Sequence, residues 1–301
     1  MPFVQFMESA LYSPGIGYYR RAQPALGKHG DFFTASQVQP LFGLLMASLL
    51  PERPVLELGP GRGEMREAFP PEQYLAVDVG ESLPPQWTGS IFANEFFDAL
   101  PVVAGVRRGS HLRELYVKRH LDRHCFIDGP ALNRRRSAYV LRYYPYLEDG
   151  NRFEIGERAL AQLRRISKCL KEGTVTVIDY GWTSAESARF PEGTLMSYRR
   201  HRATADVLGN PGEQDITAHV CFSALLDCAR EEGFEVERFE TLAQTILRGL
   251  QLCPDLAEDP RHRQSLKMLL FGMGESFRTL TLRKRPLQNK KGPKNLGPHL
   301  V

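Results

Sequence analysis

Short apolar runs alternate along the chain with longer segments in which apolar residues recur every three or four positions. The short runs predict buried strands, and they cover residues 55–58, 74–79, 90–93, 174–178, 234–239 and 277–283. The periodic segments predict amphipathic helices, and they lie within residues 2–12, 38–50, 153–171, 222–232 and 261–273. Strands that alternate with helices in this way favour a doubly wound α/β fold.

Two long segments interrupt this alternation. We expect residues 1–52 to form a helical segment ahead of one large domain, residues 53–285, that contains the sheet. Within that domain, residues 102–150 are rich in Arg and Tyr and look irregular, and residues 183–220 are too long for a plain connection. We interpret both as insertions on the substrate side of the domain.

A glycine-rich loop follows the first predicted strand and precedes a short predicted helix. Residues 55–63 read V-L-E-L-G-P-G-R-G, with Gly59, Gly61 and Gly63 spaced by one residue. Glycines let the backbone turn sharply and let a ligand approach it closely. The dinucleotide-binding form is G-x-G-x-x-G, and Glu57 in this chain would repel a pyrophosphate. A carboxylate suits a ligand with an ammonium group, such as the methionine part of S-adenosylmethionine. A tight turn without any ligand would explain the same glycines.

Acidic and amide side chains follow the next two predicted strands. Asp78 lies about 20 residues after Glu57, where an acidic residue hydrogen-bonds a ribose in such folds; an ordinary turn residue is the alternative. Asn94, Glu95 and Asp98 follow the third strand, at the edge where α/β folds bind ligands. One helical turn would place both carboxylates on the same side, ready to hold a cation. The alternative is an N-terminal helix cap.

Charge is concentrated in the last residues. The formal net charge is +4, but the charged side chains of residues 283–301 are all basic, so the rest of the chain is close to neutral. A nucleic-acid-binding protein needs a basic patch on its folded body, and we therefore expect no nucleic acid partner. Residues 286–301 are rich in Lys, Pro, Gly and Asn, which predicts a disordered basic tail that folding does not need.

The remaining polar residues predict a reduced, metal-free protein. The 5 cysteines form no C-x-x-C pair, which indicates free thiols. We see no signal or transit peptide and no apolar run close to about 20 residues, and we expect a cytoplasmic, bacterial-type protein without a membrane span. His120 and His124 flank the turn of a predicted hairpin (112–119 with 125–128), and no other nearby donors complete a metal site. We expect them to be surface residues.

Eight motifs occur in one order along the chain, and together they resemble the MidA family. They are residues 6–8 (FME), 17–19 (GYY), 30–32 (GDF), 57–63 (ELGPGRG), 93–101 (ANEFFDALP), 178–181 (IDYG), 197–201 (SYRRH) and 210–220 (NPGEQDITAHV). This family comprises methyltransferases related to the mitochondrial complex I assembly factor that methylates an arginine. The resemblance covers roughly residues 2–285. It implies a Rossmann-like, class I methyltransferase that depends on S-adenosyl-L-methionine, and a protein substrate, with a respiratory complex I-type subunit as one candidate.

The resemblance and the residue types together assign roles. We expect the cofactor to contact Glu57, Gly59, Gly61, Gly63 and Asp78, together with Gly30 and Asp31 of the N-terminal segment. Four residues of the segment 183–220 could line the substrate site, and structural hydrogen bonding is an equal alternative for each of them: Tyr198, His201, Asp215 and His219. A guanidinium stays protonated in water, so carboxylates must orient it and accept its proton. Glu95 is the first candidate for this catalytic role and Asp98 the second, and the amide of Asn94 contacts donor or substrate.

Three positions depart from the family pattern. The interval from Gly59 to Asn94 is short, so that one strand and part of its helices are expected to be missing and the adenine side of the pocket to be open. Cys221 stands where the family usually has Asp after His-Val, and Ile155 and Gly156 replace a Ser-Pro-like pair. These departures keep a second class open, a binding or assembly protein that has lost catalysis. A dehydrogenase is disfavoured by Glu57. Nothing in the residues indicates an oligomeric state.

Overall fold

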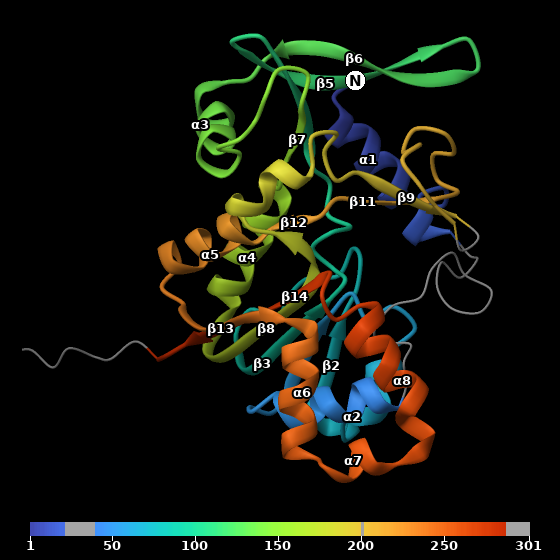
Figure 1. Cartoon of the computed structure of the whole chain (residues 1–301). Coiled ribbons are helices and arrows are strands. Elements are labelled where there is room, and N and C mark those ends of the chain that lie inside the picture. Colours follow the sequence, from blue (N-terminus) through green and yellow to red (C-terminus); the bar gives the residue numbers. More distant parts are fainter. Residues whose placement is uncertain (22–39, 200–201, 287–301) are drawn as a thin grey trace, which may run out of the picture.

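A seven-stranded mixed sheet forms the centre of the molecule (Figure 1). The structure is a computed structural model, and it describes residues 1–21, 40–199 and 202–286. The strand order is β13-β14-β8-β3-β1-β2, and β12 also pairs with β8. The seven strands are β1 (Val55–Leu58), β2 (Tyr74–Val77), β3 (Trp87–Asn94), β8 (Leu170–Trp182), β12 (Val220–Cys221), β13 (Glu235–Thr241) and β14 (Phe277–Lys284).

The sheet topology confirms the predicted doubly wound α/β fold. Strands β2, β1, β3 and β8 are parallel, and β14 and β13 add an antiparallel edge. Strand β1 lies between β2 and β3, so the chain reverses its winding direction there. Open α/β sheets bind ligands at such a switch point, outside the carboxyl ends of the strands.

Helices cover both faces of the sheet because the strand residues alternate between two apolar cores. Val175 and Val177 of β8 face one core, whereas Ile178 faces the other. The helices packed against the first core are α4 (Glu157–Cys169) and α5 (Phe222–Glu231). Those against the second are α2 (Leu41–Leu49), α6 (Leu242–Leu252) and the segment around α8 (Arg263–Lys267), with the small α7 (Asp255–Glu258) between them in sequence.

The segment that looked irregular in sequence, residues 102–150, is mostly regular structure. It contributes β4 (Val103–Arg108), the predicted hairpin as β5 (His111–His120) with β6 (Arg123–Ala131), and α3 (Arg134–Tyr143). With β7 (Arg152–Ile155) the strands form an antiparallel sheet of order β6-β5-β4-β7. The prediction of an irregular segment was wrong because the apolar signal of β5 is weak: its buried residues are Glu114, Leu115 and Val117, and charged residues surround them.

The N-terminal helix packs against this second sheet. Helix α1 (Phe3–Tyr12) is formed as predicted and buries its apolar side against β4 and β5. The Phe3 ring lies 5.3 Å from the Phe126 ring of β6. A further three-stranded sheet, within the long segment 183–220, consists of β9 (Met196–Arg199), β10 (Arg202–Thr204) and β11 (Asp215–Thr217).

Several predicted boundaries differ from the structure. The helix expected over 261–273 is broken into α8 and one π-helical turn (Met268–Gly272), in which Leu269 alone is buried. Helix α6 was not predicted. The helix expected over 38–50 is described from Leu41, and the tail 287–301 lies outside the described residues. In the part of the chain that the structure describes, no helix is long and apolar enough to span a membrane.

The connection between β2 and β3 is short, as the interval between Gly59 and Asn94 suggested. Residues 78–86 contain neither helix nor strand, and β2 is the outer strand of the sheet. Leu56 on β1 is fully buried, but its neighbour Leu75 on β2 is 43% exposed on the same face. No helix covers β2 on that face in the described residues, which leaves this corner of the fold open.

Candidate active site

The glycine loop begins directly where β1 ends. Gly59, Gly61 and Gly63 have φ values of 64°, 57° and 78°, which residues with a Cβ rarely adopt. A Cβ on Gly59 would also lie 2.8 Å from the ring of Phe96. A 3-10 helix (Glu64–Ala68) follows the loop. The three glycines are therefore required by the backbone, and the loop lies at the switch point between β1 and β3.

Glu57 is buried beneath this loop. Its side chain is 3% exposed and accepts a hydrogen bond from the Tyr74 hydroxyl on β2. Burial raises the pKa of Glu57 to about 7, although the hydrogen bond from Tyr74 acts in the opposite direction. Because a buried carboxylate is unfavourable without a counter-charge, an ammonium group seated at the loop would compensate it.

We expect Glu57 to make the stability of the ligand-free protein depend on pH. Its pKa is raised above the unfolded value, so its stabilising effect is complete below about pH 4.5 and is lost as the pH rises through about 7. At pH 8, Glu57→Gln should exceed the wild type in free energy of unfolding by up to about 3 kcal/mol. Urea unfolding of both proteins at pH 5 and pH 8 measures this. Glu154 also has a pKa near 7, but its contribution to the pH dependence is the same in both proteins and cancels in the comparison. A difference in stability that does not change with pH would contradict the prediction.

Asp78 lies on the rim of an open cleft beside the loop. It directly follows β2, is exposed, and its Oδ1 accepts a hydrogen bond of 2.7 Å from the Val79 backbone N–H. The cleft has a volume of about 330 Å³ and is lined by Leu58, Val77, Asp78, Val79 and Phe96, among others. Its size and its apolar walls, with Asp78, Glu81, Arg158 and Arg165 among its polar lining residues, fit a nucleoside. The short connection after β2 leaves it open.

The end of β3 carries Asn94 and Glu95. The Asn94 Nδ2 donates to Glu95 Oε1 at 3.2 Å, while its Oδ1 is buried without a partner in the described residues. Glu95 has a φ of 49°, and its backbone N–H donates to the Ile178 carbonyl of β8 at 2.8 Å. No helix forms over residues 95–101, so neither the cap nor the helical turn considered from sequence is present. The strained conformation at Glu95 is a mark of functional sites.

Asp179 holds the loop that carries Glu95, and sequence reasoning did not assign it a role. It is fully buried at the carboxyl end of β8. Its Oδ2 accepts the backbone N–H groups of Phe97 at 2.8 Å and Asp98 at 3.3 Å, and its Oδ1 accepts that of Tyr180 at 3.0 Å. The I-D-Y-G motif pointed to this position, but the motif did not reveal its partners in the loop after β3.

We expect Asp179→Asn to loosen this loop, because an amide NH₂ cannot accept the N–H groups now bound by one of the carboxylate oxygens. Amide hydrogen exchange should accelerate either at Phe97 and Asp98, which share one carboxylate oxygen, or at Tyr180, which uses the other, and methyl transfer should fall about tenfold or more. The Glu95 amide, which is bonded to Ile178, should stay protected. Calorimetry with S-adenosylmethionine checks that the cofactor still binds. Unchanged exchange at Phe97, Asp98 and Tyr180 together would refute the positioning role.

Acidic and tyrosine side chains from several elements meet next to Glu95. Burial, reinforced by the neighbouring Asp179 and Asp215, raises the pKa of Asp98 well above its usual range. Asp215 on β11 is 1% exposed and accepts a hydrogen bond of 2.8 Å from the Tyr19 hydroxyl. The pKa of Tyr198 on β9 is raised by burial and then by Asp98, Asp215 and Glu95. The structure thus brings together Glu95, Asp98, Tyr198 and Asp215, which sequence analysis selected separately.

The tyrosines of the N-terminal segment complete this acidic cluster. The Tyr12 ring stacks on the Tyr19 ring at 5.6 Å, and the Tyr12 hydroxyl donates to the Ala99 carbonyl at 2.8 Å. Tyr18 is a core residue. The G-Y-Y motif could have indicated this site, but the partner of Tyr19 lies far along the chain at Asp215.

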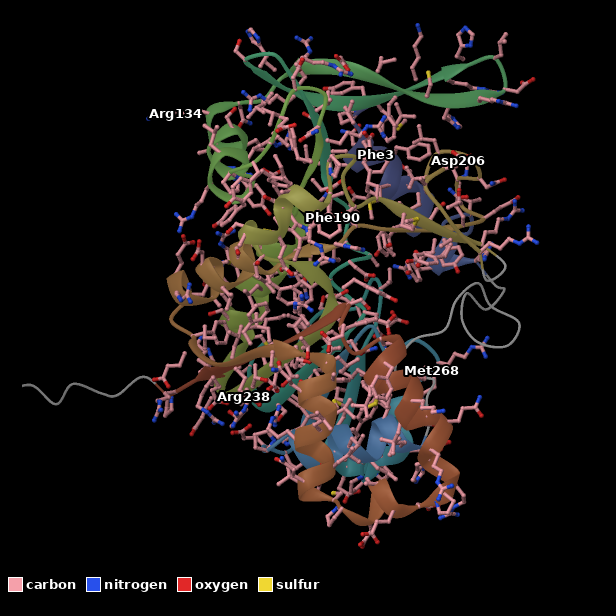
Figure 2. The ribbon with its side chains drawn as sticks, in the orientation of Figure 1. Phe3, Arg134, Phe190, Asp206, Arg238 and Met268 are labelled. Atoms are coloured by element: carbon pink, nitrogen blue, oxygen red, sulfur yellow. The ribbon has the colours of Figure 1, made fainter. Side chains whose placement is uncertain are left out.

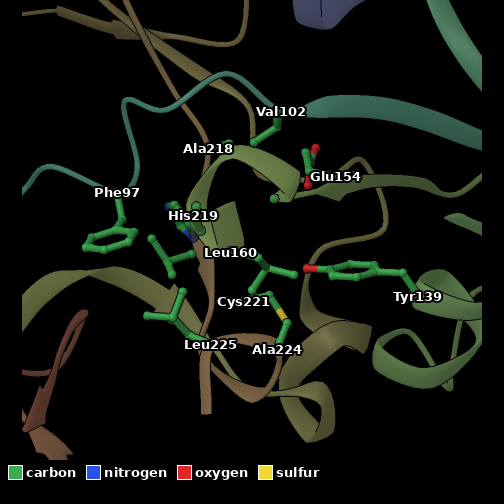
Figure 3. A pocket seen from close by; sticks show the side chains of 13 residues that line it. Phe97, Val102, Tyr139, Glu154, Leu160, Ala218, His219, Cys221, Ala224 and Leu225 are labelled. Carbon is green, nitrogen blue, oxygen red and sulfur yellow. The ribbon is translucent and has the colours of Figure 1, made fainter. Parts of the chain in front are cut away.

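His219 lies behind the acidic cluster, beside a small buried cavity (Figure 3). Its ring stacks on Tyr180 at 5.8 Å and meets the Phe190 ring edge-on at 5.4 Å. Burial lowers the pKa of His219 to about 4. His219 is therefore a neutral side chain that packs between the two aromatic rings.

Cys221, the departure from the family pattern, lines the same cavity. It occupies the N-cap position of α5, where an Asp would be a favoured cap. The Tyr139 hydroxyl hydrogen-bonds to its sulfur, and the two side chains point toward one another in Figure 3. Burial raises the pKa of Cys221 to about 12, so the thiol is unreactive.

Some predicted site residues cannot be placed. Gly30, Asp31 and His201 lie outside the described residues. Among the residues that are described, no group of three His, Cys, Asp or Glu side chains is arranged to hold a metal ion. His120 is exposed and His124 is partly exposed on the β5–β6 hairpin.

The α/β sheet, the G-x-G-x-G loop and the cleft beside Asp78 define a class I methyltransferase that uses S-adenosylmethionine. A family model described as "Putative S-adenosyl-L-methionine-dependent methyltransferase" matches residues 76–240, and the chain belongs to this family. The chain is similar to a Burkholderia thailandensis protein solved with bound S-adenosyl-homocysteine, with a TM-score of 0.83 and 26% identity. The similarity covers 94% of this chain and 88% of that one.

Two curated relatives extend the comparison. The chain is 24% identical to the mitochondrial protein arginine methyltransferase NDUFAF7 of Bos taurus, over 92% of this chain and 79% of that protein. It is 22% identical to the NDUFAF7 homolog of Caenorhabditis elegans, over 94% of this chain and 83% of that protein. The MidA-like resemblance seen in the motifs is thereby confirmed.

The residues around the loop fit S-adenosylmethionine, the cofactor of the family. The orphaned Oδ1 of Asn94 can accept from its ammonium group, and the glycine loop leaves its backbone accessible. The cleft beside Asp78 and Phe96 has room for the adenosine part. When bound, the cofactor supplies a methyl group on a sulfonium, and the protein has to align the acceptor and exclude water.

Proposed function

We propose that this methyltransferase modifies an arginine side chain of a protein. The observation that carries the proposal is the acidic cluster in which Asp98, Asp179 and Asp215 are buried and Glu95 is partly buried, with Tyr19 and Tyr198 beside them. Negative charges buried this close to one another are unfavourable unless a cation joins them. A guanidinium supplies that cation and offers five N–H donors to carboxylate oxygens. The names of the relatives, protein arginine methyltransferases, support the same substrate.

In this proposal the carboxylates have different roles. Asp179 already accepts three backbone N–H groups and acts on the loop rather than on the substrate. Glu95, at the end of β3 beside the glycine loop, is placed to orient the guanidinium and to accept its proton as the methyl arrives. Asp98 and Asp215 supply further acceptors, and the tyrosine rings of Tyr19 and Tyr198 form walls that exclude water.

The proposal is tested by comparing the proteome of cells that contain this chain with that of cells from which its gene has been deleted. Mass spectrometry should find at least one protein whose methylarginine is lost on deletion and restored by the wild-type gene. Restoration by wild type but not by Glu95→Gln links the modification to the site. Loss of methylation at lysine, or of a small-molecule product instead, would overturn the arginine assignment while leaving the methyltransferase class intact. The same data test the expectation of a complex I-type acceptor.

A further inference from the structure

A cavity with a polar floor and an apolar wall on the α2 side lies on the sheet away from the glycine loop, between the sheet and helices α2 and α6. Its volume is about 490 Å³, within the range of small-molecule sites. Its floor is made by Thr176 of β8 and by Thr279 and Thr281 of β14. Thr176 precedes Asp179 by three residues, or about 10 Å along an extended strand. The cavity therefore shares strands with the methyl-transfer site without opening into its lining.

The composition of this sheet face is unusual for a buried sheet. In doubly wound folds both faces are covered and apolar, and the opposite face of these strands follows that rule with Val175, Val177, Leu280 and Leu282. On the cavity side the alternate positions are hydroxyl residues, although Thr176 is only 7% exposed and Thr279 is fully buried. Solvent exposure thus does not explain why they are polar.

Two buried polar atoms of the cavity lining have no partner in the described residues. They are the Thr279 hydroxyl oxygen and the Arg248 Nε. A guanidinium nitrogen can only donate, and a threonine hydroxyl can donate as well. Buried donors of this kind are normally satisfied, so a ligand with hydrogen-bond acceptors in this cavity would supply the partners that they lack.

Three arginines surround these donors. The Arg248 Nη2 is held by Glu240 at 2.7 Å, and the Arg283 Nη1 by Glu52 at 2.6 Å, which fixes both guanidiniums in place. Arg238, on the edge strand β13, is exposed (Figure 2). Glu237 is the one carboxylate in the lining, and it is paired with Arg283. The three arginines are balanced by Glu52, Glu237 and Glu240, so the arrangement offers prealigned donors but too little positive charge for a polyanion.

We propose that this cavity is a binding site for one small oxyanion, a phosphate or a carboxylate. Thr279, Arg248 and Arg238 donate to its oxygens, and the salt bridges with Glu240 and Glu52 keep the guanidiniums oriented. The inference does not depend on which acceptor the enzyme methylates.

The test is calorimetry and thermal unfolding with inorganic phosphate and, separately, with acetate, against chloride at equal ionic strength. All samples contain saturating S-adenosyl-homocysteine, so that the cofactor site cannot take the anion. We expect saturable binding of one anion per chain and a raised melting temperature. A response to phosphate alone identifies a phosphate site, and a response to acetate alone a carboxylate site.

Two variants localise the binding. Thr279→Val keeps the shape and the strand propensity and should weaken anion binding about tenfold or more. Arg238→Gln changes an exposed side chain, so it should fold normally even if Thr279→Val does not, and it should also weaken binding. Thr88→Val, at an exposed position of β3, is the matched control and should bind like the wild type. No response of the wild type to either anion, or equal responses in all variants, would overturn the proposal.

Discussion

Replacing Glu95 with Gln is expected to leave S-adenosylmethionine binding nearly unchanged and to lower methyl transfer about 10²-fold or more. Glu95 lies at the end of β3, next to the strand that carries the glycine loop, and faces the acidic cluster of Asp98 and Asp215. The substitution keeps the side-chain shape and the hydrogen bond of the backbone N–H to Ile178. In the proposed reaction, it removes the charge that balances a guanidinium and the oxygen that accepts its proton.

The measurement is transfer of labelled methyl groups from S-adenosylmethionine to proteins extracted from cells without this chain. Calorimetry gives the affinity for the cofactor in parallel. Glu172→Gln, at an exposed position of β8, is the control for loss of one negative charge and should transfer like the wild type. A stable Glu95→Gln enzyme with full transfer would refute the catalytic assignment and make Asp98 the next residue to replace.

The parts of the fold that sequence predicted are those whose signal is local. The strand and glycine loop at residues 55–63 and helix α4 follow from apolar runs, glycine spacing and a periodic stripe within one segment. Helix α6 was missed because its buried side consists of Leu242, Thr245, Ile246 and Gly249, of which two are not large and apolar. Its capping box, in which Thr241 and Gln244 bond each other's backbone, was a signal that could have located it.

The candidate site, too, could be predicted only where its sequence signal is local. Asn94, Glu95 and Asp98 could be selected because polar residues after a buried strand mark the ligand edge of an α/β sheet. The contact between Tyr19 and Asp215 joins an N-terminal turn to β11, and the bonds of Asp179 join β8 to the loop after β3. No spacing within one segment encodes such contacts. The conformation at Glu95 was also misjudged, because a helical turn was considered where a left-handed residue stands.

Replacing Gly61 with Val is expected to abolish binding of S-adenosylmethionine while the protein still folds. Gly61 is exposed and has a φ of 57°, so a branched Cβ would distort the loop and project where the cofactor approaches. The backbone strain alone should cost about 1–2 kcal/mol. Gly109, in the turn between β4 and β5, is exposed, has the same φ of 57° and has no atom within 4 Å of an added Cβ.

Gly109→Val is therefore a matched control for backbone strain. Both variants should lose a similar part of the free energy of unfolding in urea, and only Gly61→Val should show no heat of S-adenosylmethionine binding by calorimetry. Loss of binding in both would mean that general destabilisation is the cause. Wild-type affinity in a folded Gly61→Val protein would show that the loop does not contact the cofactor, and the cleft beside Asp78 would then have to hold it without the glycines.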